Sequence, residues 1–251
     1  MADRTQEDGA AFAASFEAAF NGPQSQDGAV AFGVCEFGLL LAGIDGPTSP
    51  TYVRSGLGDA IPAEHLFELG MSALSARGFI EERTPDHIGD EGDEPGLVGA
   101  AFFLAGAAQY ASGHIRFAVI LPDQPFAEAF IIVSGDVAML CLAGPFQERE
   151  VRPLAAGDDL AHSIWTLATG VLGAAPAGAA LYLEWNSAAN VENPRACFIR
   201  PSGERLQIAE GDVRDGTPAV SPDLLDEAGV LRRLEGICAE VGSAPDAPSA
   251  G

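Results

Sequence analysis

The chain has 251 residues, of which 47% are hydrophobic, so it can form one large or two small domains with buried cores. It carries 36 acidic residues against 13 basic ones, a formal net charge of −23, and every basic residue is arginine. Such a chain repels phosphate backbones and anionic lipids, which disfavours nucleic acids and membrane surfaces as partners. The absence of lysine also excludes a Walker A phosphate loop, a Schiff-base lysine and a protein kinase.

The first 90 residues predict a mostly helical region. Phe12, Phe16 and Phe20 recur every four residues and define one helical face. Further helices are expected over residues 29–44 and over residues 63–77, the latter with an apolar face of Leu66, Leu69, Ala73 and Leu74 and with Gly78 as its cap. The Gly-, Pro- and Ser-rich stretch between these helices predicts a loop with a short strand over residues 51–54.

Residues 91–243 have a different pattern, typical of an α+β domain with a hairpin-built antiparallel sheet flanked by helices. Helices are expected over residues 97–111, 158–172 and 222–241, the last capped by Ser221 with Pro222 at its first position. Strands are expected over residues 115–121, 129–133, 137–142, 147–152, 180–185, 195–200 and 205–209. Residues 244–251 predict a disordered tail, and the acidic loop over residues 86–96 predicts a linker.

The C-terminal half resembles the YbjN family. The resemblance lies in Trp185-Asn186, the hairpin around Ser202-Gly203-Glu204, and the closing segment that begins Val220-Ser221-Pro222-Asp223. It implies a fold similar to that of the type III secretion chaperones, a small α+β domain that is dimeric in those chaperones. It also implies a non-enzymatic role in binding, chaperoning or regulating another protein. The insert over residues 187–193 and the turn without consecutive aspartates depart from the family pattern, and residues 1–90 have no counterpart in it.

Trp185 and Asn186 are candidate protein-binding residues, because tryptophan is enriched in interface hot spots. The alternative, which we favour, is that Trp185 packs under the sheet and that Asn186 caps a turn.

No cofactor or metal site is expected. Each of the four cysteines lies in an apolar run, which is typical of small buried residues in a reducing, cytoplasmic compartment. The four histidines do not stand at metal-ligand spacing, and the acidic loop lacks a calcium-loop pattern. The polar start of the chain is unlike a signal peptide, and no apolar run reaches the roughly 20 residues of a membrane-spanning helix.

Three functions stay open. The first is an acidic cytoplasmic chaperone, adaptor or regulator that binds another protein and forms a homodimer. The second is a subunit of a larger assembly, docked through Phe12, Phe16 and Phe20. The third is an enzyme with a cryptic site of Asp, Glu and Arg, which would require converging carboxylates with perturbed pKa values.

Overall fold

The computed structural model divides the chain into two compact units. Unit 1 comprises Met1–Gln109 and Gly144–Pro153, and unit 2 comprises Tyr110–Ala143 and Leu154–Gly251. The residues that the structure describes are 14–15, 18–21, 25–55, 57, 63–81, 96–120, 125–135, 137–144, 148–155, 158–174, 179–187, 194–202, 205–212 and 223–242. Expectations for residues 1–13, 86–95 and 244–251 lie outside this part of the chain.

Unit 1 is built around one buried helix, α2 (Val34–Ala42), whose Phe37, Leu40 and Leu41 are each at most 2% exposed. Three helical segments pack against it: α3 (Pro50–Arg54), α4 (Ala63–Ala76) and α5 (Gly99–Gln109), while the 3-10 helix η1 (Gly43–Thr48) follows it directly. Two short strand pairs complete the unit, β1 (Val30–Phe32) with β7 (Arg149–Ala155) and β2 (Ile80–Glu81) with β3 (Gly96–Leu97).

The secondary structure differs from the sequence expectation in two segments of unit 1. The segment expected as one helix over residues 29–44 begins as strand β1, and the helix starts only after Gly33, whose backbone is extended (φ −63°, ψ 156°). The Gly33 N–H donates to the Glu36 carboxylate, which satisfies one of the donors that a helix start leaves unpaired. The strand expected over residues 51–54 is the short helix α3, because Pro50 occupies the first helical position.

Helix α4 ends as its sequence predicts. Gly78 has φ +72°, its N–H donates to the Ser75 carbonyl, and the Phe79 N–H donates to the Leu74 carbonyl. These two bonds form a Schellman motif, so the prediction of Gly78 as the cap is confirmed. Leu69, however, is 55% exposed.

The buried stripe of α4 contains the predicted Leu66 and Leu74, with Gly70 in place of Leu69, while Ala73 is partly buried. The spacing of apolar residues does not show whether Leu69 or Gly70 faces α2. In the structure α2 approaches so closely that only a residue without a side chain fits, and Gly70 occupies this position.

Helix α5 belongs to unit 1, although the sequence analysis placed the boundary between the two regions near residue 90. It packs against α2 and η1, and the Thr51 hydroxyl of α3 donates to the Ala108 carbonyl at 2.9 Å. The helix has no charged residue, so its apolar surface can be buried on more than one side.

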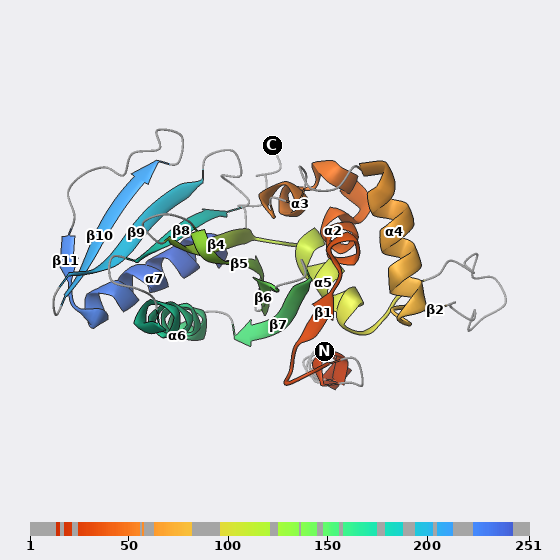
Figure 1. Ribbon diagram of the computed structural model, residues 1–251, viewed down its shortest axis with the longest axis horizontal. Coiled ribbons are helices and arrows are strands. Elements are labelled where there is room, and N and C mark those ends of the chain that lie inside the picture. Colours follow the sequence, from red (N-terminus) through yellow and green to blue (C-terminus); the bar gives the residue numbers. More distant parts are fainter. Residues whose placement is uncertain are drawn as a thin grey trace, which may run out of the picture. The chain divides into compact units, whose positions relative to one another are not determined.

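Unit 2 is an antiparallel sheet with helices on one face (Figure 1). The strand order is β6-β5-β4-β8-β9-β10-β11. The bounds are β4 (Gly113–Ile120), β5 (Pro125–Ser134), β6 (Val137–Ala143), β8 (Ala180–Ser187), β9 (Arg195–Ser202), β10 (Arg205–Asp212) and β11 (Asp223–Leu225). Both predicted hairpins, β5–β6 and β9–β10, are confirmed, and the α+β class is confirmed with them.

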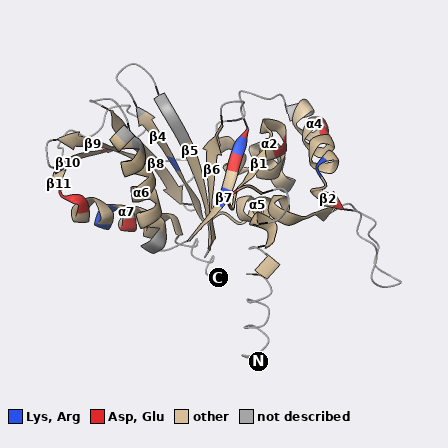
Figure 2. Ribbon diagram, turned by 60° about the horizontal axis from the view of Figure 1, so that its bottom comes forward, with Lys and Arg blue, Asp and Glu red and all other residues tan. Residues whose placement is uncertain are grey.

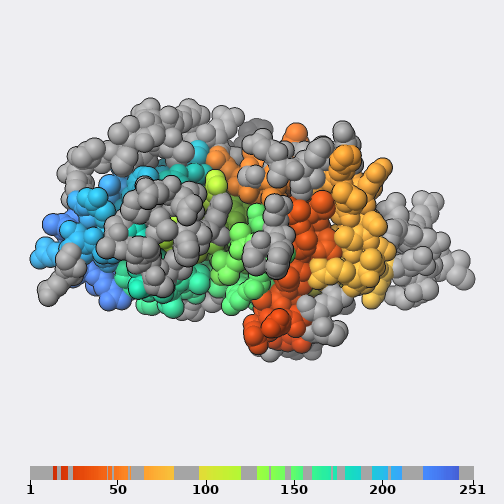
Figure 3. All heavy atoms as spheres, in the orientation of Figure 1, coloured from red at the N-terminus to blue at the C-terminus, as the bar shows by residue number. Residues whose placement is uncertain are grey.

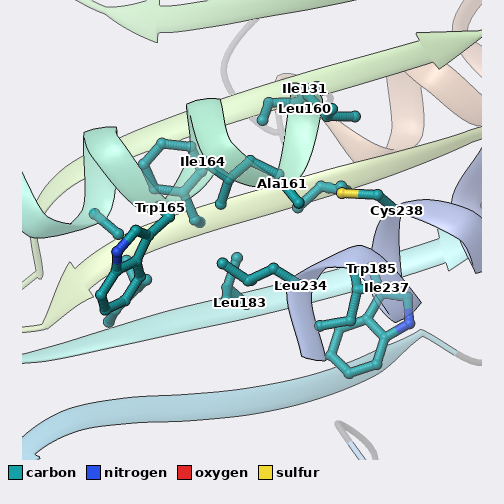
Figure 4. Packing of buried hydrophobic residues seen from close by; sticks show 14 of the residues in the cluster. Ile131, Leu160, Ala161, Ile164, Trp165, Leu183, Trp185, Leu234, Ile237 and Cys238 are labelled. Atoms are coloured by element: carbon teal, nitrogen blue, oxygen red, sulfur yellow. The ribbon is translucent and has the colours of Figure 1, made fainter. Parts of the chain in front are cut away.

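Two helices cover this sheet, α6 (Asp158–Ala174) and α7 (Glu227–Gly242). Figure 4 shows Leu160, Ile164 and Leu234 of these helices facing Ile131 and Leu183 of the strands. All five side chains are at most 1% exposed, and they belong to one cluster that continues along every second residue of the strands.

Helix α7 begins later than predicted. Ser221 and Pro222 lie outside the described residues, and Asp223–Leu225 forms the short strand β11 paired with β10. The helix starts at Glu227, and the Asp226 side chain accepts the Gly229 N–H at 2.8 Å. Asp226 is therefore the N-cap. Among the described residues, no helix is long and apolar enough to cross a membrane.

The close contact between α2 and α4 makes Gly70 sensitive to substitution. A Cβ at Gly70 would lie 2.8 Å from the Cys35 carbonyl oxygen and 2.9 Å from the Leu39 Cβ. We expect Gly70→Ala to lower the free energy of unfolding by about 1–3 kcal/mol, because the two backbones must separate. At Gly106, in α5, a Cβ would meet nothing within 4 Å.

The matched control Gly106→Ala should therefore raise the free energy of unfolding by about 0.5–1 kcal/mol through helix propensity. Urea denaturation measures the free energy of unfolding of both variants. Equal effects of the two substitutions would contradict the described packing of α2 on α4.

Candidate functional site

The two sequence-predicted binding residues of unit 2 are both buried. Trp185, on β8, is 1% exposed and lies in the core against α7 (Figure 4). Asn186 is 4% exposed, and it stands opposite His114 of β4 on the other face of the sheet. Both side chains are buried in the described part of the chain, and their role in binding a partner stays a prediction.

Trp185 is held by a group of charged residues that fastens α7 to the strands. Its indole Nε1 donates to Glu240 Oε2 at 3.2 Å, and Arg195 Nη1 donates to the same oxygen at 2.9 Å. The Arg195 guanidinium also lies 5.2 Å from the centre of the Trp185 ring, a cation–π distance. Glu210, on β10, forms ion pairs with both Arg195 and Arg233.

The second tryptophan repeats this arrangement. Trp165, on α6, is 8% exposed, and its indole Nε1 donates to Glu227 Oε1 at 2.8 Å at the start of α7. Figure 2 shows that acidic and basic residues alternate along parts of α7. The helix-covered face is therefore closed by a packed core and by hydrogen bonds from both indoles.

The opposite face of the same strands carries a different set of side chains. Leu181, Leu183 and Cys197 point into the core under the helices. Because successive strand residues point to opposite faces, Tyr182, Glu184 and Phe198 lie on the other face of the sheet. The Tyr182 and Phe198 rings are 5.0 Å apart at 48°, and the Tyr182 hydroxyl donates to Glu184 Oε2 at 2.9 Å. Burial, followed by the charge of Glu184, raises the pKa of Tyr182, so the phenol stays protonated.

This set continues across four strands. Arg116 of β4 stands directly opposite Glu184 of β8, and Arg200 Nε donates to Gln207 Oε1 between β9 and β10. Arg205 falls on the same face by alternation from Leu206, which packs on the core. We call this set the outer-face patch: Arg116, Tyr182, Glu184, Phe198, Arg200, Arg205 and Gln207.

In the described part of its face, the outer-face patch is accessible. Tyr182, Phe198 and Glu184 are partly exposed, and Arg200 and Arg205 are exposed. Toward β5 and β6 the same face is buried: the His114 ring stacks on Phe130 at 5.4 Å, and Ile132 and Met139 are fully buried.

The sequence analysis missed the outer-face patch. The signal was the strand alternation itself: once Leu181, Leu183 and Trp185 are assigned to the core, Tyr182 and Glu184 must share the other face.

Unit 1 contains a buried carboxylate, Glu36, which is 3% exposed. Its Oε2 accepts from the Gly33 N–H at 2.6 Å and from Arg77 Nη1 at 2.7 Å. The Arg77 guanidinium also lies 4.9 Å from the centre of the Phe79 ring. Glu36 thus joins the start of α2 to the end of α4, a structural use of a buried ion pair.

The predicted aromatic stripe of the N-terminal helix is only partly within the described residues. Phe20 is 1% exposed, so it packs inside unit 1 and offers no surface to a partner. Phe12 and Phe16 lie outside the described part of the chain. Among the described residues of unit 1, the exposed large apolar side chains are spread over three helices: Val53 on α3, Phe67 and Leu69 on α4, and Phe102 on α5. The space-filling view shows α4 (orange), which carries two of them, at the surface (Figure 3).

The described histidines do not gather at one place. His65 and His162 are exposed on α4 and α6, His114 is buried on β4, and His87 lies outside the described residues. Within the described ranges, no three His, Cys, Asp or Glu side chains are grouped as a metal site requires.

Searches with the sequence found no protein-family model and no curated protein that matches this chain.

The hydrogen bond from Trp185 to Glu240 predicts that substitutions of these two residues have non-additive effects on the free energy of unfolding. Glu240→Ala leaves a buried indole N–H without its acceptor, so we expect the free energy of unfolding to fall by about 1–3 kcal/mol. The control Glu235→Ala, five residues earlier on α7, removes the same charge at a partly exposed position, and we expect the free energy of unfolding to fall by less than about 0.5 kcal/mol.

In a Trp185→Phe background, which has no indole N–H, the effect of Glu240→Ala should shrink markedly. An undiminished effect in that background would show that Glu240 acts through something other than Trp185.

The four cysteines are free and differ in burial. Burial, with lesser effects of nearby carboxylates, raises the pKa of Cys197 and of Cys238 to about 12, and Cys141 is buried, whereas Cys35 is partly exposed. At pH 8 we expect Ellman's reagent to titrate about one thiol in the native protein and all four after unfolding. Cys35→Ser should abolish the native reaction, and rapid reaction of two or more thiols would contradict the described burial.

The raised thiol pKa values also predict the sign of an alkaline effect. The two buried thiols contribute fully to stability below the unfolded-state pKa of 9.0. This contribution is lost as the pH rises toward about 12, because the unfolded chain can ionise its thiols first. Replacing Cys197 and Cys238 with alanine should therefore reduce the loss of stability above pH 9, measured by urea denaturation.

Proposed function

We propose that this chain is a non-enzymatic protein-binding adaptor or regulator that holds a segment of another protein against the outer-face patch of unit 2. The observation that carries the proposal is the contrast between the two faces of one sheet. Two helices seal one face, while the other presents a partly exposed aromatic pair beside charged groups. Tyrosine and arginine, both present in the patch, are the residue types enriched at interface hot spots.

Binding across the face fits the sheet better than binding at the edge. Strand addition would use β11, which has three residues and is flanked by Asp226 and Glu227. Short, charged edge strands are a device that limits edge pairing. The partner is therefore expected to contact side chains of β8, β9 and β10 rather than the β11 backbone.

The resemblance of the C-terminal half to the YbjN family supports the same proposal, since that family is associated with regulation rather than catalysis. The homodimer that the chaperone-like fold implies belongs to this proposal as well. Four free cysteines favour a reducing compartment, so we propose the cytoplasm as the site of action.

The proposal predicts where a partner can be cross-linked. A photoreactive benzoylphenylalanine that replaces Phe198 should form a discrete cross-linked product in a lysate of the source cells, because this ring lies in the patch. The same group at Thr169, exposed on α6, should not give that product. The product formed at position 198 should be lost in Tyr182→Ser, which removes the neighbouring ring. Equal products at positions 198 and 169 would contradict a specific site on the outer face.

A further inference from the structure

The outer-face patch differs in charge from the rest of the chain. It contains three arginines and one glutamate, a formal charge of +2, in a protein whose net charge is −23. Arg116 stands opposite Glu184, so its charge is balanced within the patch. Arg200 and Arg205 remain, and both are exposed.

Neither of these two arginines has a carboxylate partner among the described residues. In contrast, Arg77, Arg152, Arg195 and Arg233 each pair with a glutamate. The Gln207 side chain accepts the Arg200 Nε–H, which fixes the guanidinium while its terminal NH₂ groups remain for a ligand. The guanidinium of Arg200, held by Gln207, and that of the exposed Arg205 lie on one accessible face and are suited to carboxylates.

The spacing of the patch indicates the shape of the ligand. Phe198 and Arg200 are two residues apart on β9, about 7 Å along the strand. An extended peptide repeats its side chains on one side at the same spacing. A segment laid along β9 can therefore place a carboxylate at Arg200 while its residue two positions away covers the Tyr182–Phe198 pair.

The number of charges favours an acidic peptide over a nucleic acid. A single-stranded nucleic acid carries one phosphate per nucleotide, and the surrounding chain of net charge −23 repels a polyanion of that density. A peptide with two carboxylates matches two arginines, and charges farther away than about 8–10 Å are screened at physiological salt.

We propose that the outer-face patch binds an extended acidic segment of a partner protein, with Asp or Glu side chains at Arg200 and Arg205 and an aromatic or large apolar residue on the Tyr182–Phe198 pair. This inference rests on the proposed function and specifies the partner's chemistry.

The test is an NMR titration of the ¹⁵N-labelled full chain at physiological ionic strength with the blocked peptide Phe-Thr-Glu-Thr-Glu, because Arg200 and then Ser202, which pairs with Arg205, follow Phe198 on this face of β9. Phe-Thr-Gln-Thr-Gln is the neutral control, and a ten-nucleotide uridine RNA is the competing class. We expect the acidic peptide to shift backbone signals of β8, β9 and β10, with the neutral peptide binding at least fivefold more weakly. Arg200→Gln and Arg205→Gln should each raise the dissociation constant about three- to fivefold.

The matched control is Arg232→Gln, an exposed arginine on α7 outside the patch. It changes the net charge from −23 to −24, as do the two test variants, and it should alter the dissociation constant by less than twofold. Unchanged thermal unfolding and an unchanged spectrum outside the patch verify that each variant is folded.

Three results would overturn the inference. Equal binding of the neutral peptide would remove the acidic requirement, and cross-linking at position 198 would still decide the proposed function separately. RNA that binds more tightly than the acidic peptide would assign the patch to nucleic acid. No shift of patch signals at millimolar acidic peptide would exclude this ligand class.

Discussion

Successive side chains of a strand point to opposite faces, and α6 and α7 cover only one face of the unit-2 strands. This constraint sorts the residues of β4, β8 and β9 into two sets. Ile115, Leu183 and Trp185 enter a core that the helices close, and Arg116, Glu184 and Tyr182 take the other face. A shift of one residue in the pairing of β8 would exchange the sets, so the packing that fixes the register also positions the outer-face patch.

Charge is used differently in different parts of the molecule. Glu36 with Arg77 in unit 1, and Glu240 with Arg195 in unit 2, fasten helices at points where a buried group needs a partner. Removing Arg77 would leave the buried Glu36 carboxylate without its ion partner, and removing Glu240 would leave the buried Trp185 indole N–H without its acceptor, so both pairs are structural. Arg200 and Arg205 instead lie on an accessible face beside aromatic rings, which is the arrangement expected of a recognition surface.

Much of this fold could be predicted from the sequence, because the apolar spacing in the hairpins and in α6 is regular and Gly78 has a conformation that few other residues adopt. The start of α7 could not, since Asp226 rather than Ser221 supplies the cap once β11 pairs with β10. Leu69 and Phe20 show the same limit: spacing identifies a helix, but the neighbouring helix decides which side chains become buried. The outer-face patch combines residues from four strands, so it becomes visible only when their register is known.

The central claim is that one face of the unit-2 sheet is sealed and the other is open to a partner. Hydroxyl-radical footprinting of the full-length protein with mass spectrometry tests this directly, because radicals oxidise aromatic rings that solvent reaches. We predict oxidation of Tyr182 and Phe198 and protection of Trp185, although indole is intrinsically the more reactive ring. Protection of Tyr182 and Phe198 to the same degree as Trp185 would show that the outer face is covered, and would contradict the account.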